Sequence, residues 1–299
     1  MVELSAHSDS RPVMGGESVI TVVGGSPAML DDAFGLASMC EAAWSRFVSD
    51  SELDRVNQAD GARVEISPLT VALIQEMSDG FELTAGDFNP TLLPRVVEVG
   101  YLASLVHEGR VTHVPAGARV FDSLDDIDLD ERSVQLPSGM TLDSGGIGKG
   151  FAADLIAVAV MNSGAEGVMV SMSGDVVVAG ESPQGGAWLL GVEDPFDEQS
   201  HVDIVRLVEG SVVTSSQRKR RFAQGHHLID PKTGLSASTP VQTVSVIART
   251  GARAEVLAKS GFLRPTPEYL EWLPSVGAAG LVIDSSGARH ESENWKLYR

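Results

Sequence analysis

Apolar positions in the first hundred residues follow both strand-like and helix-like spacing. A β-branched run at 18–24 ends in two glycines and predicts a strand. Between 26 and 47, apolar residues recur at helical intervals behind a Ser-Pro start and an acidic pair, which predicts an amphipathic helix. Ser67 and Pro68 are typical of a helix start and predict a second helix after them. The next segment, 86–94, is rich in turn formers and predicts a loop outside the core.

The rest of the chain groups its strands together between single helices. Apolar spacing predicts a helix at 148–164, and the later segments comprise strands at 168–180, 188–195, 201–216 and 241–249, helices at 250–262 and 265–273, and a hairpin at 281–290. Grouped strands favour an α+β fold over a doubly wound parallel sheet. No repeat or obvious linker interrupts the pattern. We therefore expect one domain over residues 14–299, preceded by a flexible leader at residues 1–13.

The charge balance narrows the possible partners. The chain has 22 Lys+Arg against 41 Asp+Glu, a formal net charge of −19. Such a surface repels phosphate backbones and anionic lipids, so neither a nucleic acid nor a membrane is expected as a partner. No run of about 18 apolar residues is present, and the first residues lack the pattern of a signal peptide, so a cytoplasmic location is expected. The single cysteine, Cys40, lies among small apolar residues and is expected to be a buried thiol.

A glycine-rich segment, LDSGGIGKGFAAD at 142–154, is the sharpest local motif. Its glycines precede a predicted helix, and backbone N–H groups at such a turn can hold phosphate oxygens. The segment is not a Walker A loop, because that motif needs Gly at Asp143 and Ser or Thr at Gly150. A dinucleotide GxGxxG motif is excluded too, because it needs glycine at Phe151. The alternative interpretation is a tight strand-to-helix turn with a solvated Lys149.

Two further segments carry candidate chemistry. Four consecutive cations at 218–221 could hold an anion, although a solvated turn explains them equally well. The segment GHHLIDPKTG at 225–234 combines His227, Asp230 and strong turn formers. A histidine beside a carboxylate can act as a general base, although a lone imidazole is more often a core residue with a hydrogen-bond partner.

Seven segments together resemble the ApbE family of flavin transferases. They are, in chain order, MGGESVITVVG, FVSDSELDRVN, GDFNPTLLPRV, LDSGGIGKGFAAD, VSMSGDVVVAG, SVVTSS and HHLIDPKTG. The resemblance implies a single α+β domain around one FAD. It also implies an enzyme that cleaves FAD with Mg²⁺, releases AMP and attaches FMN to a Thr or Ser of an acceptor protein.

The resemblance also implies roles for individual residues. It places Met14, Phe47, Asp87, Phe88, Asn89, Asp143, Lys149 and the backbone of Leu228 in contact with FAD. Phe47 stands where the family usually has tyrosine, which keeps a stacking face and loses a hydroxyl. His227 would activate or position the acceptor hydroxyl, and Asp230 would orient its turn.

The predicted metal site departs from the family pattern. Gly146 corresponds to the backbone ligand and Glu255 to the usual aspartate, whereas Lys259 occupies the position of a ligating threonine. Glu255 and Lys259 are four residues apart, so on a helix they share a face and can form an ion pair. Three hypotheses follow: an FMN transferase with an atypical metal site, a non-catalytic FAD-binding protein, and an FAD pyrophosphatase that yields FMN and AMP.

Overall fold

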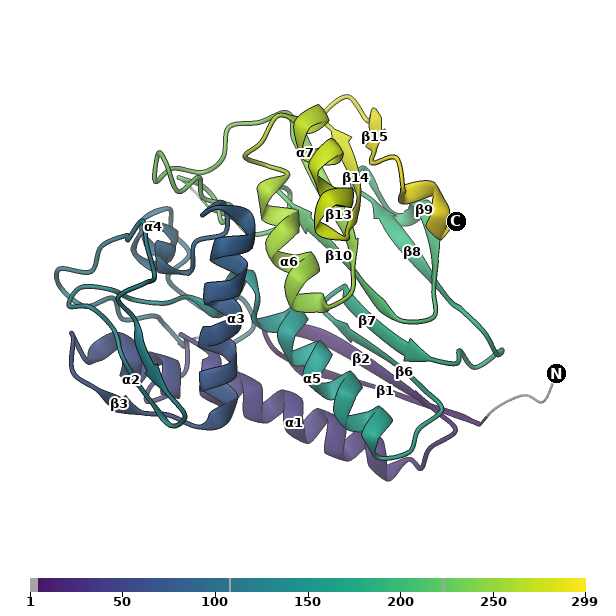
Figure 1. Ribbon diagram of the computed structural model, residues 1–299, viewed down its shortest axis with the longest axis horizontal. Coiled ribbons are helices and arrows are strands. Elements are labelled where there is room, and N and C mark those ends of the chain that lie inside the picture. Colours follow the sequence, from purple (N-terminus) through teal and green to yellow (C-terminus); the bar gives the residue numbers. More distant parts are fainter. Residues whose placement is uncertain (1–4, 108, 223) are drawn as a thin grey trace.

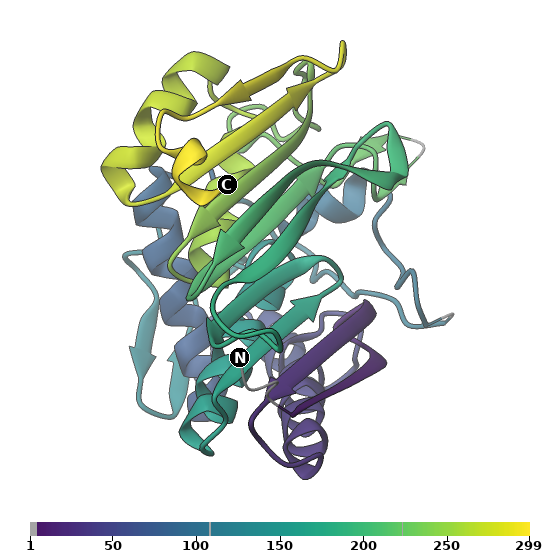
Figure 2. The same cartoon turned by 90° about the vertical axis from the view of Figure 1, so that its right-hand side faces the viewer.

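The computed structural model describes residues 5–107, 109–222 and 224–299, and its largest element is an eight-stranded sheet (Figure 1). The strands in spatial order are β1 (Ala6–Val13), β2 (Gly16–Val23), β6 (Gly167–Met172), β7 (Asp175–Gly180), β10 (Gly210–Ser216), β13 (Val241–Ala248), β14 (Ala279–Asp284) and β15 (Arg289–Glu291). Every neighbouring pair is antiparallel. Figure 2 shows the N-terminal strands at one end of this sheet and the C-terminal strands at the other. The predicted α+β class is confirmed.

Helices cover one face of this sheet. They are α1 (Ala28–Trp44), α5 (Gly148–Asn162), α6 (Gly251–Ser260), α7 (Thr266–Trp272) and the short turn η3 (Leu273–Val276). Alternate residues of a strand point to opposite faces, so Val244 and Val246 of β13 pack under α6 while Ile247 points the other way. The helices predicted within 26–47, 148–164, 250–262 and 265–273 are therefore confirmed.

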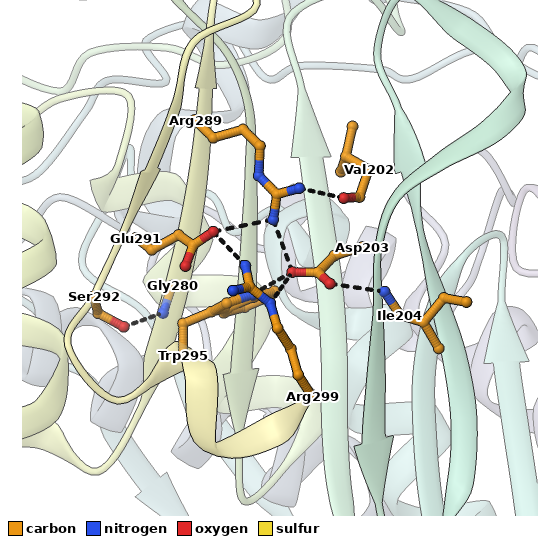
Figure 3. Close-up of polar contacts among 9 residues, drawn as sticks. All are labelled: Val202, Asp203, Ile204, Gly280, Arg289, Glu291, Ser292, Trp295 and Arg299. Carbon is orange, nitrogen blue, oxygen red and sulfur yellow. Dashed lines mark hydrogen bonds and ion pairs between the residues drawn. The ribbon is translucent and has the colours of Figure 1, made fainter.

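A two-stranded ribbon covers the opposite face of the sheet. It consists of β8 (Trp188–Asp194) and β9 (Asp197–Leu207), and β8 buries every second residue, beginning with Trp188, against the sheet. Asp203 ties the ribbon to the C-terminal turn η4 (Trp295–Tyr298): its carboxylate accepts from Trp295 Nε1 at 2.9 Å and pairs with Arg289 and Arg299, each at 2.8 Å (Figure 3). This network fixes the last residues of the chain far from the helical face.

A smaller lobe lies beside α3 (Pro68–Thr84), at the left of Figure 1. It comprises α2 (Glu52–Gln58), α4 (Leu93–Glu98), the turn η1 (Pro90–Leu92) and a three-stranded sheet of β3 (Val64–Glu65), β5 (Ser133–Gln135) and β4 (Asp128–Asp130). Three short elements complete the fold: the turn η2 (Ser144–Gly146) and the paired strands β11 (Arg221–Phe222) and β12 (Gly225–His226). Ser67 caps α3 by accepting from Thr70 N, as its sequence predicts.

Two sequence predictions are corrected by the fold. Residues 6–13 of the expected leader form β1, which pairs along its whole length with β2. The connecting Met14 and Gly15 have φ of 58° and 79°, the backbone of a tight two-residue hairpin. The segment 86–94 was expected outside the core, yet Pro90 and Leu93 are buried because η1 and α4 pack them inward. The rest of the expected leader, residues 1–4, lies outside the described ranges.

None of the helices in the described ranges combines the length and apolar character needed to cross a membrane. The first turns of helices α5 and α6 pack closely against each other. A Cβ added at Gly150 would lie 2.3 Å from the carbonyl oxygen of Gly251. Asp154 of α5 also accepts from the N–H groups of Gly251 and Ala252 at 2.7 and 2.9 Å. The two helix starts therefore touch through backbone atoms.

Replacing Gly150 by alanine is expected to lower the free energy of unfolding by about 3 kcal/mol or more, because the new methyl group meets backbone that cannot rotate away. Thermal and urea unfolding measure the change. Gly35→Ala is the matched control, since Gly35 lies within α1 with open space around its Cβ position and alanine favours a helix. Equal stability of the Gly150→Ala variant and the natural protein would show that the two helices do not meet this closely.

Candidate functional site

A cavity lies between the small lobe and the helical face of the large sheet. Ten of the twelve predicted site residues line it: Met14, Phe47, Asp87, Phe88, Asn89, Asp143, Gly146, Lys149, His227 and Leu228. Glu255 lies beneath the wall with its side chain 1% exposed, and Asp230 is outside the lining. The structure thus brings together residues from five separate segments of the sequence.

The glycine-rich loop forms the floor of this cavity. Asp143 begins the turn η2, and its Oδ1 accepts from Gly145 N at 3.0 Å. Helix α5 then starts at Gly148, so its N-terminus, which favours anions, faces the cavity beside Lys149. The glycine segment is a tight turn, but the alternative of a solvated lysine is wrong, because the Lys149 side chain is only 15% exposed.

Four charged side chains form a buried cluster behind the loop. Lys149 Nζ donates to Asp175 and to Glu255 Oε1, the latter at 2.6 Å. Glu255 Oε2 accepts from Gly150 N at 2.9 Å. Lys259 Nζ lies 3.7 Å from Glu255 Oε1 and donates to the Glu255 carbonyl oxygen at 3.1 Å. The i,i+4 ion pair predicted for Glu255 and Lys259 is therefore present, although Lys149 makes the shorter contact.

The ionisation of this cluster follows from its mutual contacts. Burial disfavours charge, but Asp175 and Glu255 raise the pKa of Lys149 above its ordinary value. Burial acts against Glu255 as well, and Lys149 and Lys259 nevertheless hold its pKa below the ordinary value. The Lys149–Glu255 pair is therefore ionised. Asp175 was not predicted as a site residue, although it lies in VSMSGDVVVAG, one of the segments that resemble the family, directly before the apolar run of β7.

The predicted metal ligands do not fit a divalent cation. Both carboxylate oxygens of Glu255 already have partners, and two ammonium groups lie within 4 Å of Oε1. Gly146 would contribute only a backbone oxygen beside Lys259, whose Cε is 3.8 Å from a Cβ built at Gly146. Within the described ranges, no three or more His, Cys, Asp or Glu side chains are grouped so that they could hold a metal. Mg²⁺ favours oxygen ligands free of such competition.

His227 is the titratable side chain best placed for proton transfer. Its ring makes no hydrogen bond within the described part of the chain, and Nδ1 is buried, so Nε2 is the nitrogen that can reach the cavity. Burial, followed by the nearby cations of Arg220 and Lys259, lowers the pKa of His227 well below its ordinary value. The imidazole is therefore neutral near pH 7. Its neighbour His226 is instead structural, because its ring bonds to Ala237 O at 3.2 Å and accepts from Leu228 N at 3.3 Å.

Three of the predicted site residues use their polar groups for hydrogen bonds within the protein. The Leu228 N–H donates to His226 Nδ1, its C=O accepts from Ala237 N, and its side chain lines the wall; the predicted contact of its backbone with FAD stays a prediction. Asn89 donates to Phe121 O and accepts from Thr91 N, each at 2.8 Å. The carboxylate of Asp230 accepts from Lys232 N at 2.9 Å, which holds the turn after His227, and makes no contact with the imidazole.

The acidic residue at 87 and its neighbour have distinct roles. Asp87 forms an ion pair with Arg264, whose guanidinium also donates to Thr84 O at 2.7 Å. Phe88 is buried, and its ring atoms would lie 3.0 Å from a Cβ at Gly146. These contacts join the end of α3 to the segment after α6 and to the glycine loop, so they set the width of the cavity.

Aromatic side chains form another part of the cavity wall. The ring centroid of Phe47 is 5.5 Å from that of Tyr101, which stacks on Phe222 at 4.9 Å. Arg46 lies over both Phe47 and Tyr101, and its guanidinium pairs with Asp143 at 3.4 Å. Arg46 and Tyr101 were not predicted. A buried arginine gives no signal in sequence, because arginine is ordinarily exposed.

Comparisons with known proteins identify the family of this chain. The model of the ApbE family matches residues 14–281. A protein of Treponema pallidum named FAD:protein FMN transferase is 29% identical over 79% of this chain and 71% of its own length. One of the same name from Klebsiella pneumoniae is 27% identical over 83% of this chain and 79% of its own.

Solved structures show the same fold. The ApbE protein of Thermotoga maritima superposes with a TM-score of 0.85 at 25% identity, covering 98% of this chain and 99% of the other. The flavin transferase ApbE of Vibrio cholerae superposes with a TM-score of 0.82 at 21% identity, covering 99% and 100%. The family match extends over nearly the whole chain and includes every segment that lines the cavity. This chain belongs to the ApbE family.

Proposed function

We propose that this chain transfers FMN from FAD to a Thr or Ser side chain of an acceptor protein and releases AMP. The observation that carries the proposal is the position of a neutral His227 in the same cavity as Lys149 and Lys259. A base for a hydroxyl and cations for a diphosphate are the two requirements of this reaction. The names of the relatives support the same activity.

Different residues of the cavity would bind the flavin ring and the diphosphate of FAD. The side chains of Phe47 and Tyr101 offer aromatic surface to a planar ring system. The N-terminus of α5 and the ammonium groups of Lys149 and Lys259 offer N–H donors to the diphosphate.

The transfer itself balances as a phosphoryl substitution. The acceptor hydroxyl oxygen attacks the phosphorus of the FMN half and forms a phosphoester bond, and the bond from that phosphorus to the bridging oxygen breaks. AMP leaves with the bridging oxygen, and the hydroxyl proton passes to Nε2 of His227. The tautomer with its proton on Nδ1 leaves Nε2 free to accept it.

The rate of transfer is expected to be insensitive to histidine protonation near neutral pH. His227 acts in its neutral form, and burial together with Arg220 and Lys259 holds its pKa well below 6.5. Lowering the pH from 8 to 6.5 therefore leaves His227 unprotonated, and kcat/KM falls only when the pH approaches the lowered pKa. A fall in kcat/KM with its midpoint at or above pH 6.5 would contradict this environment for His227.

The proposal is tested with FAD and an extract of source cells that lack this gene. Covalently attached flavin is detected by fluorescence of denatured proteins in a gel, with the His227→Gln variant as control. A fluorescent protein band that requires the natural chain supports the proposal. Release of AMP and free FMN without a labelled band would identify a pyrophosphatase, and intact bound FAD would identify a non-catalytic FAD-binding protein.

The expected cytoplasmic location stays a prediction.

A further inference from the structure

The position of Lys259 sets this cavity apart from a metal-binding one. The side chain extends from α6 along the glycine loop and reaches the cavity wall, with 16% of its surface exposed. Nζ donates to Ser215 Oγ at 3.3 Å and to Glu255 O at 3.1 Å. An ammonium group has three donors, so one N–H of Lys259 has no partner within the described ranges.

Lys149 also has one N–H donor free for a ligand. Its Nζ donates to Asp175 and Glu255, which leaves its third N–H without a partner in the part of the chain that the structure describes. Lys149 and Lys259 both line the cavity, and both lie within 4 Å of Glu255 Oε1. Two ammonium groups therefore face the same part of the cavity from α5 and α6, each with one donor to offer.

The charge balance of the cluster opposes a divalent cation. Two carboxylates, Asp175 and Glu255, and two ammonium groups give a net charge near zero. A divalent cation at Glu255 would displace Lys149 from Oε1, which is 2.6 Å from its Nζ, or lie against that ammonium group and be repelled by it. A diphosphate has the opposite effect, because its negative charge is attracted to the ammonium groups of Lys149 and Lys259, which both line the cavity.

We propose that this chain transfers FMN without a divalent metal, with Lys149 and Lys259 supplying the positive charge at the diphosphate. Each ammonium donates its third N–H to a non-bridging or bridging oxygen and stabilises the charge that develops on the leaving AMP. Lys259 is a catalytic residue in this account because it contacts the substrate. The inference rests on the proposed function, since it concerns the charge needed for that transfer.

The test measures covalent flavin incorporation in EDTA-treated extract and protein. The natural chain is expected to keep its full rate in EDTA, and added Mg²⁺ is expected to give no increase. Lys259→Met keeps the volume of the side chain and removes its charge, and is expected to slow incorporation about 100-fold. Glu255 retains Lys149 and Gly150 as partners in that variant, so the fold is expected to persist, which thermal unfolding checks. Lys296→Met is the matched control, because Lys296 is exposed and lies outside the cavity lining.

Three results would overturn the inference. Incorporation that stops in EDTA and returns with Mg²⁺ would show a metal-dependent transferase and leave the proposed function intact. A Lys259→Met rate equal to that of the natural chain would remove the role of this ammonium. Absence of incorporation with and without Mg²⁺ would instead overturn the proposed function, and this inference with it.

A second readout does not depend on activity. Electron paramagnetic resonance of Mn²⁺ added to the FAD-free protein is expected to show no bound ion in this cluster. One Mn²⁺ bound per chain and lost in Glu255→Gln would contradict the inference, because it would show that Glu255 exchanges Lys149 for a metal.

Discussion

His227→Gln is expected to slow FMN transfer by about 100- to 10,000-fold, the range for loss of a general base. The imidazole makes no hydrogen bond within the described ranges, so its removal breaks no hydrogen bond of the fold. Binding of FAD, followed by the change in its fluorescence, is expected to remain close to that of the natural protein. The effect should therefore appear in kcat and not in the stability of the complex.

The adjacent histidine provides a matched control for this prediction. His226 is buried and bonds to Ala237 and Leu228, so His226→Gln should lower the unfolding temperature more than His227→Gln does. Its kcat per folded molecule should exceed that of the His227 variant. An unchanged kcat in His227→Gln would show that the hydroxyl loses its proton by another route.

Glu255→Gln is expected to lower the free energy of unfolding by about 3–5 kcal/mol, the cost of removing one partner from a buried ion pair. The amide can still accept from Gly150 N, but it leaves Lys149 with Asp175 as its remaining carboxylate and Lys259 with none. Urea unfolding at neutral pH measures the difference.

An exposed ion pair of the same length serves as the control. Glu98 pairs with Arg95 at 2.6 Å, the distance from Glu255 to Lys149, but both side chains are about half exposed. Glu98→Gln is expected to change stability by less than about 1 kcal/mol. Equal effects of the two substitutions would show that the Glu255 cluster is hydrated and not buried.

Local sequence signals predict most of the fold. The β-branched strand at 18–24 and the Ser67-Pro68 helix start are short-range patterns, and both elements form where expected. β1 was missed because its residues alternate polar and apolar only weakly, and its pairing depends on the turn at Met14 and Gly15. The burial of Pro90 could not be predicted, because it depends on contacts with distant segments.

Some residues of the candidate site can likewise be predicted from local sequence, and others cannot. The glycine loop and the turn carrying His227 are continuous motifs, so their residues were found from sequence. Asp175 and Arg46 acquire their roles only through the fold, which places β7 beside the start of α5 and the end of α1 beside Asp143. The partners of Glu255 come from α5 and from its own helix α6, so spacing revealed Lys259 but could not reveal that Lys149 makes the shorter contact.

The ratio of AMP released to flavin covalently attached tests the central claim most directly. The labelled acceptor is purified from the extract assay and incubated with FAD and the natural chain, and AMP and the intact mass of the acceptor are followed together. The account predicts one AMP for each FMN joined to the acceptor through a phosphoester. AMP formed together with an equal amount of free FMN, and an acceptor of unchanged mass, would contradict it.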